Sequence, residues 1–324
     1  MTTRSHGSYL FFPVVLCLLL GPPSAPAAEN HGAWDGESWA DYTPFIAPIT
    51  AAVETRINEI ATRGAALGRS PGRVGQYGDS ISESWAFLRN VILSGPDANA
   101  TGHDYTPVLD WLRSAYADAT ADEGRLGDHL GKGPDYGNKG GWTLKDLVDH
   151  GHPGKAADTG DGSDPGNFSW AIVMIGSNDI HRRGWNKMAW RMQLRALLLD
   201  IADLGIVPVM STIPPRIDHL EDGRVDDANF HIRGLARQLR LPIVDYHDLI
   251  TTTRPGDWHG TLLSDDGVHP SAGGAGRDFS RQGLEFTDGY AARSKLVLDV
   301  AERLRPLLER AYADGPGPEI SSRK

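Results

Sequence analysis

Cysteine is nearly absent from this chain. Its 324 residues include a single cysteine, Cys17. A disulfide needs two thiols and a cysteine-based zinc site needs several, so the sequence excludes both within one chain. Cys17 lies in a segment that we expect to be removed, which would leave a mature protein without a thiol nucleophile. The hydrophobic core must therefore hold the fold without crosslinks.

Basic residues are outnumbered, and metal-binding motifs are missing. Lys and Arg total 32 against 42 Asp and Glu, which gives a formal net charge of −10. This acidic balance argues against nucleic acid and anionic lipid as partners. There is no H-E-x-x-H motif, and the histidines His150, His152, His181, His219 and His247 lack the spacing of a ligand set. We therefore predict neither a metal nor a cofactor.

Long hydrophobic runs are also scarce. The longest, 9–20, is shorter than the roughly 20 apolar residues that a membrane span needs, and Pro13 interrupts it. It follows Arg4 and precedes Ala25-Pro26-Ala27, the order of a secretory signal, whereas a membrane anchor would need a longer run. We predict a signal peptide over 1–27, and a secreted or periplasmic protein with no stable membrane insertion after cleavage.

The remaining chain alternates between strand-like and helix-like segments. Hydrophobic residues make up 40% of the sequence and charged residues 23%, as in ordinary soluble globular proteins. Continuous apolar runs predict buried strands, and the expected strands are 73–77, 171–175, 206–210 and 241–244. Helical stripes separate them, which predicts a parallel sheet covered by helices on both faces, an α/β/α sandwich.

Several segments flank or interrupt this pattern. We expect an N-terminal helical extension over 28–70, packed on a main domain that spans 71–312, and a frayed tail over 313–324. Gly-rich and Asp-rich stretches predict insertions near 95–165, with helices around Trp111, and near 271–289. A helix with Phe230, Leu235 and Leu239 is expected, and a last helix that Pro306 kinks or ends.

The tripeptide Gly78-Asp79-Ser80 raises the first question of function. It follows the first predicted strand and precedes a possible helix. Ser and Asp are favoured helix caps, so the motif alone does not distinguish a cap from a nucleophile. A catalytic serine also needs a base, a group that orients the base and donors for an oxyanion.

Three further segments provide those groups. Gly176-Ser177-Asn178-Asp179 directly follows a buried strand, and Asp266-Gly267-Val268-His269 follows the last strand. Between the first two strands lies 138–143, which contains the pair Gly140-Gly141. Each segment alone could be a cap or a turn. Together they supply a base, an orienting carboxylate and oxyanion donors at the strand ends, where parallel sheets carry their sites.

This set of segments resembles the SGNH/GDSL hydrolase superfamily, over roughly residues 72 to 312. The resemblance implies a doubly wound, flavodoxin-like sheet and a Ser-His-Asp triad in which Ser80 attacks an ester, His269 is the base and Asp266 orients it. It favours Asp266 over the adjacent Asp265. It also implies an oxyanion hole formed by the Ser80 and Gly141 backbone N–H groups and the Asn178 side chain. The second segment lacks the strand usual in the family, so the choice between Gly141 and Gly140 stays open.

A second serine fits a different motif. Gly68-Arg69-Ser70-Pro71-Gly72 matches the G-x-S-x-G spelling of the α/β-hydrolase nucleophile elbow. An elbow follows a strand and opens a helix, whereas Ser70 follows a predicted helix and precedes a strand. The context therefore disfavours Ser70.

Four tryptophans lie beside the candidate segments: Trp85, Trp142, Trp185 and Trp258. They could be core residues or an aromatic surface on which a sugar ring stacks. With the predicted export, they favour a serine esterase that removes short acyl groups, chiefly acetyl, from carbohydrate. The alternatives are a polysaccharide O-acyltransferase that uses the same acyl-enzyme and a lipase or lysophospholipase. A non-catalytic binding module would leave the triad unexplained.

Overall fold

The computed structural model describes residues 39–115, 137–150 and 167–314. The predicted signal peptide over 1–27, most of the predicted tail and part of the insertion near 95–165 lie outside the described residues. No helix in the described ranges has the length and apolar composition needed to cross a membrane.

A four-stranded parallel sheet forms the centre of the molecule, in the order β1-β3-β4-β5. The strands are β1 (Ser70–Gly78), β3 (Phe168–Met174), β4 (Val207–Ser211) and β5 (Ile243–Val244). All of β3 and β4 is buried, as their continuous apolar sequences predict. Because all pairs are parallel, the carboxyl ends of the strands lie at one edge of the sheet.

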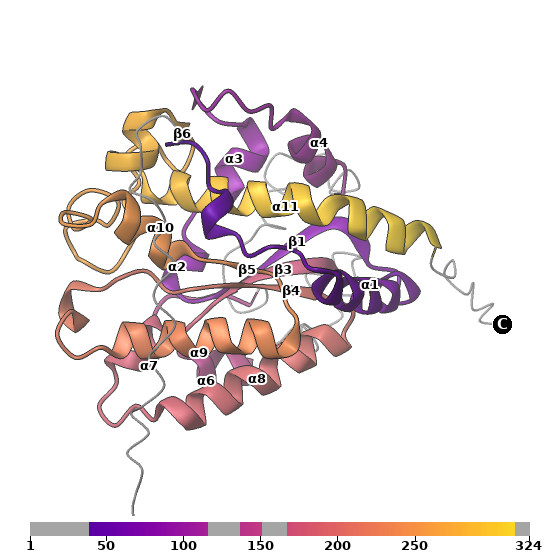
Figure 1. Ribbon diagram of the computed structural model, residues 1–324, viewed down its shortest axis with the longest axis horizontal. Coiled ribbons are helices and arrows are strands. Elements are labelled where there is room, and N and C mark those ends of the chain that lie inside the picture. The colour runs from indigo at the N-terminus through magenta and orange to yellow at the C-terminus, as the bar shows by residue number, and fades with distance from the viewer. Residues whose placement is uncertain (1–38, 116–136, 151–166, 315–324) are drawn as a thin grey trace, which may run out of the picture.

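Helices cover both faces of this sheet (Figure 1). One face carries α3 (Arg89–Ser94), α4 (Thr106–Ser114) and α11 (Gly289–Asp314), and α1 (Ala51–Ala66) packs against α11. The other face carries α6 (Leu144–His150), α7 (Ser177–His181), α8 (Lys187–Asp203) and α9 (Arg224–Leu239). The shorter elements are η1 (Thr43–Phe45), α2 (Ser80–Glu83), η5 (Ile217–His219), α10 (Tyr246–Thr253) and η6 (Gly283–Thr287). The predicted three-layer α/β fold is confirmed.

Both predicted helices are present. Phe230, Leu235 and Leu239 all lie on α9, where Phe230 is 65% exposed and the buried face contains Val225, Asn229 and Ile232. The last helix does not end at Pro306 but continues to Asp314. A proline inside a helix removes one hydrogen bond, and burial of the apolar side chains that follow it offsets this loss.

The two predicted insertions contact each other. β2 (Ala98–Asn99) in the first pairs in parallel with β6 (Asp278–Phe279) in the second. The expected helix around Trp111 is α4, and the Trp111 ring stacks on that of Trp170 in β3, with 6.4 Å between ring centroids. This contact joins the first insertion to the central sheet.

Candidate active site

Ser80 lies at the carboxyl end of β1, as the first residue of the short helix α2. The Asp79 side chain caps this helix by accepting a hydrogen bond from the Ile81 N–H at 3.0 Å. Gly78 must be a glycine, because a Cβ there would collide with the Met174 carbonyl oxygen and the Ser82 hydroxyl. This close packing fixes the direction in which the chain leaves the strand, and so the place of the serine.

His269 and Asp266 lie in line with the Ser80 hydroxyl. Ser80 Oγ is 2.8 Å from His269 Nε2, and His269 Nδ1 is 2.7 Å from Asp266 Oδ2. With its Nδ1–H directed to the carboxylate, a neutral imidazole presents an unprotonated Nε2 to the hydroxyl. The structure thus joins the three side chains that the sequence predicts as nucleophile, base and orienting acid. The carboxylate bonded to His269 Nδ1 is that of Asp266 and not that of the adjacent Asp265.

The Asp266 carboxylate is held by its own loop. Its Oδ1 accepts hydrogen bonds from the Val268 N–H at 2.8 Å, the His269 N–H at 2.9 Å and the Ser264 hydroxyl at 2.8 Å. Partial burial alone would raise the pKa of Asp266, but these hydrogen bonds and that from His269 outweigh it and hold the pKa well below the usual range. The carboxylate is therefore ionised at neutral pH and can stabilise an imidazolium.

One long-range contact positions this loop. The Ile217 N–H donates to the Gly267 carbonyl oxygen at 3.0 Å. Gly267 has a φ of +66°, and a Cβ there would collide with the Ile217 side chain. Glycine is therefore required twice at this point, by the backbone conformation and by the close approach of Ile217.

Beneath Ser80 lies a buried pair of charged residues. Burial raises the pKa of Asp79 to about 6, although the Ile81 N–H and the nearby Arg293 act in the opposite direction. Arg293, from α11, is almost fully buried; its Nη1 donates to the Ile81 carbonyl at 2.9 Å and its Nη2 to the Ser82 hydroxyl at 3.3 Å. Its guanidinium also lies 3.5 Å from the centre of the Phe87 ring. Sequence analysis missed Arg293, which lies in the last helix.

The segment 137–142 approaches Ser80 beside β1. The Gly78 N–H donates to the Gly137 carbonyl at 3.0 Å, and Asn138 forms a one-residue parallel bridge with Gly78. The Asn138 side chain donates to the Gln76 carbonyl at 2.9 Å. This short pairing stands where the sequence showed no strand, because one bridge leaves no apolar pattern to detect.

The expected oxyanion donors lie at this segment. Asn178 Nδ2 donates to the Trp142 carbonyl at 2.9 Å, which holds the amide and leaves its second N–H for an oxyanion. The Gly140 N–H donates to Glu83 Oε2 at 2.6 Å and is therefore already used. Of the two glycines, Gly141 is the one that remains as a donor. Glu83 was not singled out by sequence analysis, although it lies only three residues after Ser80.

The tryptophans differ in exposure. Trp85, which follows α2, is 50% exposed, whereas Trp142 and Trp258 are buried. Trp185 is partly buried and packs edge-on against Trp190, with 6.0 Å between centroids. In this conformation only Trp85, of these four, presents a large surface to a substrate.

The rival Ser70 begins β1 and so does not stand at a strand-to-helix elbow.

One cluster of side chains has the composition of a metal site. His181, Asp218 and His219 place possible ligand atoms within 4.8 Å of one another. The Arg216 guanidinium, however, donates to both Asp218 carboxylate oxygens, at 2.9 Å and 2.8 Å. A fixed positive charge in this position opposes a divalent cation, so these residues do not fit a metal ion.

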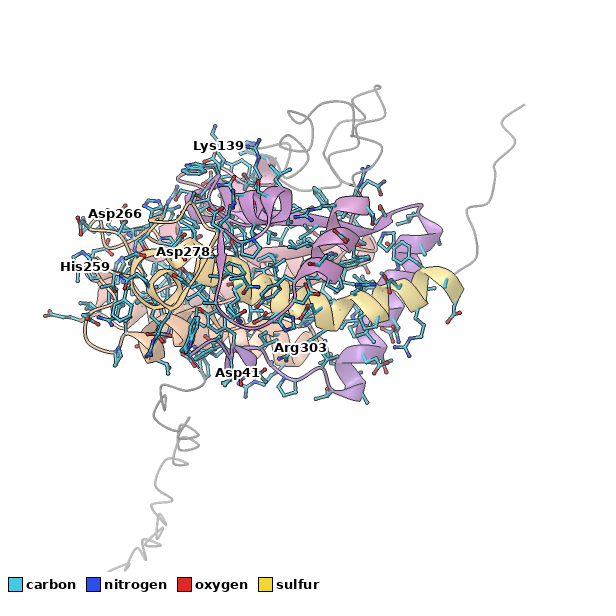
Figure 2. The ribbon with its side chains drawn as sticks, turned by 90° about the horizontal axis from the view of Figure 1, so that it is seen from above. Asp41, Lys139, His259, Asp266, Asp278 and Arg303 are labelled. Atoms are coloured by element: carbon cyan, nitrogen blue, oxygen red, sulfur yellow. The ribbon has the colours of Figure 1, made fainter. Side chains whose placement is uncertain are left out.

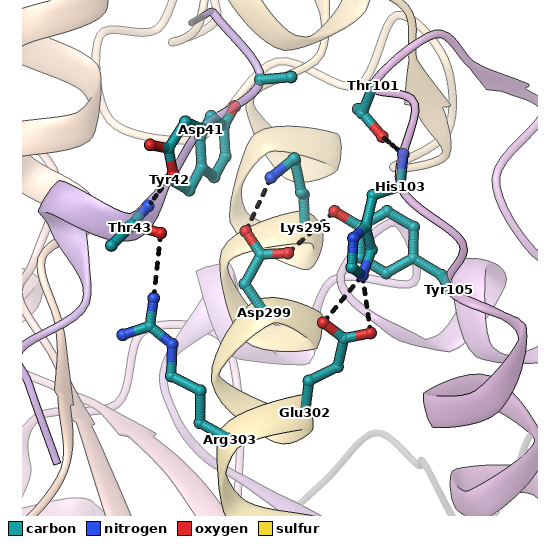
Figure 3. A pocket seen from close by; sticks show the side chains of 11 residues that line it. Asp41, Tyr42, Thr43, Thr101, His103, Tyr105, Lys295, Asp299, Glu302 and Arg303 are labelled. Atoms are coloured by element: carbon teal, nitrogen blue, oxygen red, sulfur yellow. Dashed lines mark hydrogen bonds and ion pairs between the residues drawn. The ribbon is translucent and has the colours of Figure 1, made fainter.

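A separate cavity of about 510 Å³ lies along α11 (Figure 3). Four of its lining side chains form two pairs, His103 with Glu302 and Lys295 with Asp299. Asp41 and Arg303, which line it, lie far from Lys139 of the segment beside Ser80 (Figure 2). Ser80, Asp266 and His269 are not among its lining residues. The cavity is thus distinct from the candidate active site.

Solved structures with a related fold include three from bacteria. A GDSL-like lipase from Bacteroides thetaiotaomicron VPI-5482 is 14% identical, with a TM-score of 0.45, and the match covers 82% of this chain and 98% of that one. A catalytic mutant of an acetylxylan esterase from Geobacillus stearothermophilus is 15% identical (TM-score 0.40; 72% and 93% covered). The lipase/acylhydrolase from Enterococcus faecalis is 15% identical (TM-score 0.42; 71% and 95% covered). No curated protein matches the chain.

The model of one protein family matches residues 76–277. The matched range is more than half of the chain and contains all four segments that carry the resemblance seen in the sequence. That resemblance is confirmed, and the chain belongs to the GDSL-like lipase/acylhydrolase family.

Proposed function

We propose that this protein is a serine esterase that hydrolyses carboxylic esters through an acyl-enzyme, with short acyl esters of carbohydrate as its substrates. The observation that carries the proposal is the alignment of Ser80 Oγ with His269 Nε2 at 2.8 Å and of His269 Nδ1 with Asp266 at 2.7 Å. Membership of an acylhydrolase family supports the same reaction class.

In the first step, Ser80 Oγ attacks the ester carbonyl carbon while its proton passes to His269 Nε2. The carbonyl oxygen becomes an oxyanion, which the N–H groups of Ser80, Gly141 and Asn178 stabilise. The carbon–oxygen bond to the alcohol then breaks, and His269 returns the proton to that alcohol. Asp266, ionised at neutral pH, stabilises the imidazolium throughout.

In the second step, water attacks the acyl carbon while its proton passes to His269 Nε2. The bond from this carbon to Ser80 Oγ then breaks, the carboxylic acid leaves, and His269 returns the proton to Ser80 Oγ. The exposure of the triad favours water over another acceptor, because the side chains of His269 and Asp266 are 38% and 51% exposed. Such exposure gives water access to the acyl-enzyme. We therefore place hydrolysis ahead of acyl transfer to a polysaccharide.

The proposed substrate class depends on Trp85 and on the N-terminus. Trp85, half exposed and close in sequence to Ser80, offers an aromatic face for a sugar ring. The predicted signal peptide would deliver the protein outside the cytoplasm, to the periplasm or the medium, where acylated polysaccharides are found. Both points favour carbohydrate esters over long-chain lipids.

The test compares wild type with Ser80→Ala on an aryl acetate and on acetylated polysaccharide, and Ser70→Ala is the matched control for the rival serine. We expect Ser80→Ala to lose activity by about 10⁶-fold in kcat, and Ser70→Ala to behave as wild type. A fluorophosphonate should label the wild type and not Ser80→Ala. Wild-type rates from Ser80→Ala would refute the nucleophile assignment, and acetylated acceptor in place of free acetate would favour the transferase.

A further inference from the structure

One side chain of the nucleophile helix reaches across to the segment that carries the candidate oxyanion donor. Glu83 closes α2, three residues after Ser80. Its Oε2 accepts a hydrogen bond from the Gly140 N–H at 2.6 Å, a short distance typical of a charge-assisted bond. We propose that Glu83 is a positioning residue that holds the Gly140–Gly141 turn in place for oxyanion binding; this inference rests on the proposed esterase function.

The turn itself has a defined conformation. The Trp142 N–H donates to the Lys139 carbonyl at 3.2 Å, so 139–142 forms a β-turn. Gly141, at its third position, has a φ of +78°, which is the mark of a type II turn. A Cβ at Gly141 would meet no atom within 4 Å. Glycine is therefore required there by the backbone conformation alone.

This turn passes close to the nucleophile. A Cβ built on Gly140 would lie 3.8 Å from Ser80 Cβ and 3.1 Å from Glu83 Oε2. Gly140 thus stands between Ser80 and Glu83, and the bond to Glu83 withdraws its N–H from the oxyanion. The neighbouring Gly141 N–H is left to serve the reaction.

Contacts that do not involve Glu83 fix the two ends of the turn, but none of them fixes its centre. The Lys139 N–H donates to the Gly78 carbonyl at 3.3 Å, and the Trp142 carbonyl accepts from Asn178. The two residues between are glycines, which have more backbone freedom than any other residue. In the described part of the chain, Glu83 accepts the one hydrogen bond that the two central N–H groups donate. Without it, we expect the turn to populate other conformations.

A loosened turn should affect the transition state more than the ground state. Oxyanion donors contribute to catalysis when they are already oriented, because reorienting them during the reaction costs free energy. The substrate carbonyl carries little negative charge before attack and gains little from these donors. Loss of Glu83 should therefore lower kcat and leave KM nearly unchanged.

Glu83 could act through its negative charge or as a hydrogen-bond acceptor, and these two roles can be distinguished. A carboxylate close to Ser80 repels a developing oxyanion, so the charge itself gives the reaction no benefit. If Glu83 acts by accepting a hydrogen bond, glutamine should replace it, because its amide oxygen is also an acceptor. Glu83→Gln should retain activity within about threefold of wild type, whereas Glu83→Ala should lose about 10- to 100-fold in kcat.

A second variant tests the turn directly. Proline is favoured at the second position of a type II turn, which Gly140 occupies, and it has no N–H that needs a partner. In the Glu83→Ala background, Gly140→Pro should therefore restore most of the lost kcat. A double variant that remains as impaired as Glu83→Ala would contradict a positioning role.

The experiment measures kcat and KM for an aryl acetate, the affinity for a trifluoromethyl ketone analogue and the melting temperature, for wild type, Glu83→Ala, Glu83→Gln and the double variant. Glu59→Ala, an exposed glutamate of α1, is the matched control. We expect Glu83→Ala to lose analogue affinity in proportion to kcat/KM. An unchanged kcat in a folded Glu83→Ala, or a loss of kcat without loss of analogue affinity, would overturn the inference.

The two proposals fail in different ways. If wild type hydrolyses no ester, or Ser80→Ala does so at the wild-type rate, the proposed function is wrong whatever Glu83 does. If Ser80→Ala is inactive and Glu83→Ala matches wild type, only the role of Glu83 is lost. Should Glu83→Ala fail to fold, the same decision rests on Glu83→Gln: a kcat within about threefold of wild type supports a hydrogen-bond acceptor at this position, and a loss of about 10-fold or more contradicts it.

Discussion

The two halves of the candidate site are supported in different ways. Ser80 rests on residues from distant parts of the chain: Met174 of β3 packs against Gly78, and Arg293 of α11 binds the carbonyl of Ile81. His269 rests on its own loop, where Asp266 and Ser264 supply most of the hydrogen bonds. The position of Ser80 therefore depends on contacts across the whole fold, whereas the position of His269 depends largely on the six residues 264–269.

This contrast separates stability from activity. Loss of Arg293 beneath Ser80 removes buried contacts and should destabilise the protein as well as inactivate it. Substitutions in the loop 264–269 change exposed groups with local partners, and should lower activity while leaving the free energy of unfolding nearly unchanged. Four variants test this division.

The largest effect is expected for His269→Ala. Without a base, the Ser80 hydroxyl keeps its proton, and kcat for an aryl acetate should fall by about 10⁴- to 10⁶-fold. The midpoint of urea unfolding should stay close to that of wild type, because the side chain is partly exposed and its partners are local. A large shift of that midpoint would show that the loop supports the fold after all.

Arg293→Met should give the largest loss of stability. Removing the buried guanidinium leaves the Ile81 carbonyl, the Ser82 hydroxyl and Asp79 without their partner, at a cost of about 3 to 5 kcal/mol in the free energy of unfolding. Urea titration measures it. Arg303→Met, on the same helix, is the control. The Arg303 guanidinium donates to the Thr43 hydroxyl at 3.2 Å in an exposed contact, so its loss should change stability by less than about 0.5 kcal/mol. Equal losses of stability in Arg293→Met and Arg303→Met would show that the buried contacts of Arg293 contribute no more than the exposed contact of Arg303.

Asp79→Asn should stabilise the protein at neutral and alkaline pH. The pKa of Asp79 is about 6 when folded, against about 4 when unfolded, so the folded state holds a proton between these values that the unfolded state has lost. Stability therefore falls as pH rises from 4 to 6, by about 2 kcal/mol. Asparagine still accepts from the Ile81 N–H and avoids this loss.

Melting temperatures at pH 4 and pH 8 test this sign. At pH 8 Asp79→Asn should melt at a higher temperature than wild type, and this difference in melting temperature should be smaller at pH 4. A variant less stable than wild type at pH 8 would mean that the attraction between Asp79 and Arg293 exceeds the cost of burying the carboxylate.

Ser264→Ala should have the smallest effect. The Ser264 hydroxyl is one of several donors to Asp266, so its loss should lower kcat by about 10-fold or less. Stability should again be nearly unchanged. If kcat instead falls as far as in His269→Ala, the loop depends on Ser264 more than its hydrogen bonds indicate.

The sequence predicted the parts of this protein that follow local patterns. Apolar runs located the strands, and short motifs identified Ser80, Asn178, Asp266 and His269, which the structure brings to one edge of the sheet. The exposure of Phe230 does not follow from hydrophobicity, because α9 instead buries the polar Asn229, whose side chain bonds the backbone of Ile213.

Other parts depend on contacts between distant residues and leave no local pattern. Nothing near Arg293 in the sequence indicates that it lies beneath Ser80. The Glu83–Gly140 bond joins residues on two segments, and the bridge at Asn138 is too short for strand periodicity to appear. The burial of Trp142 and Trp258 likewise depends on the assembled fold, and each looked equal to Trp85 in the sequence.

The position of Arg293 has a consequence for how the protein is made. A ribosome synthesises the chain from the N-terminus, so Ser80 emerges long before α11, and the helix that supports it comes last. A nascent chain, or one truncated before residue 293, therefore has the nucleophile but not its support. The activity proposed for Ser80 should then appear only after α11 has been synthesised.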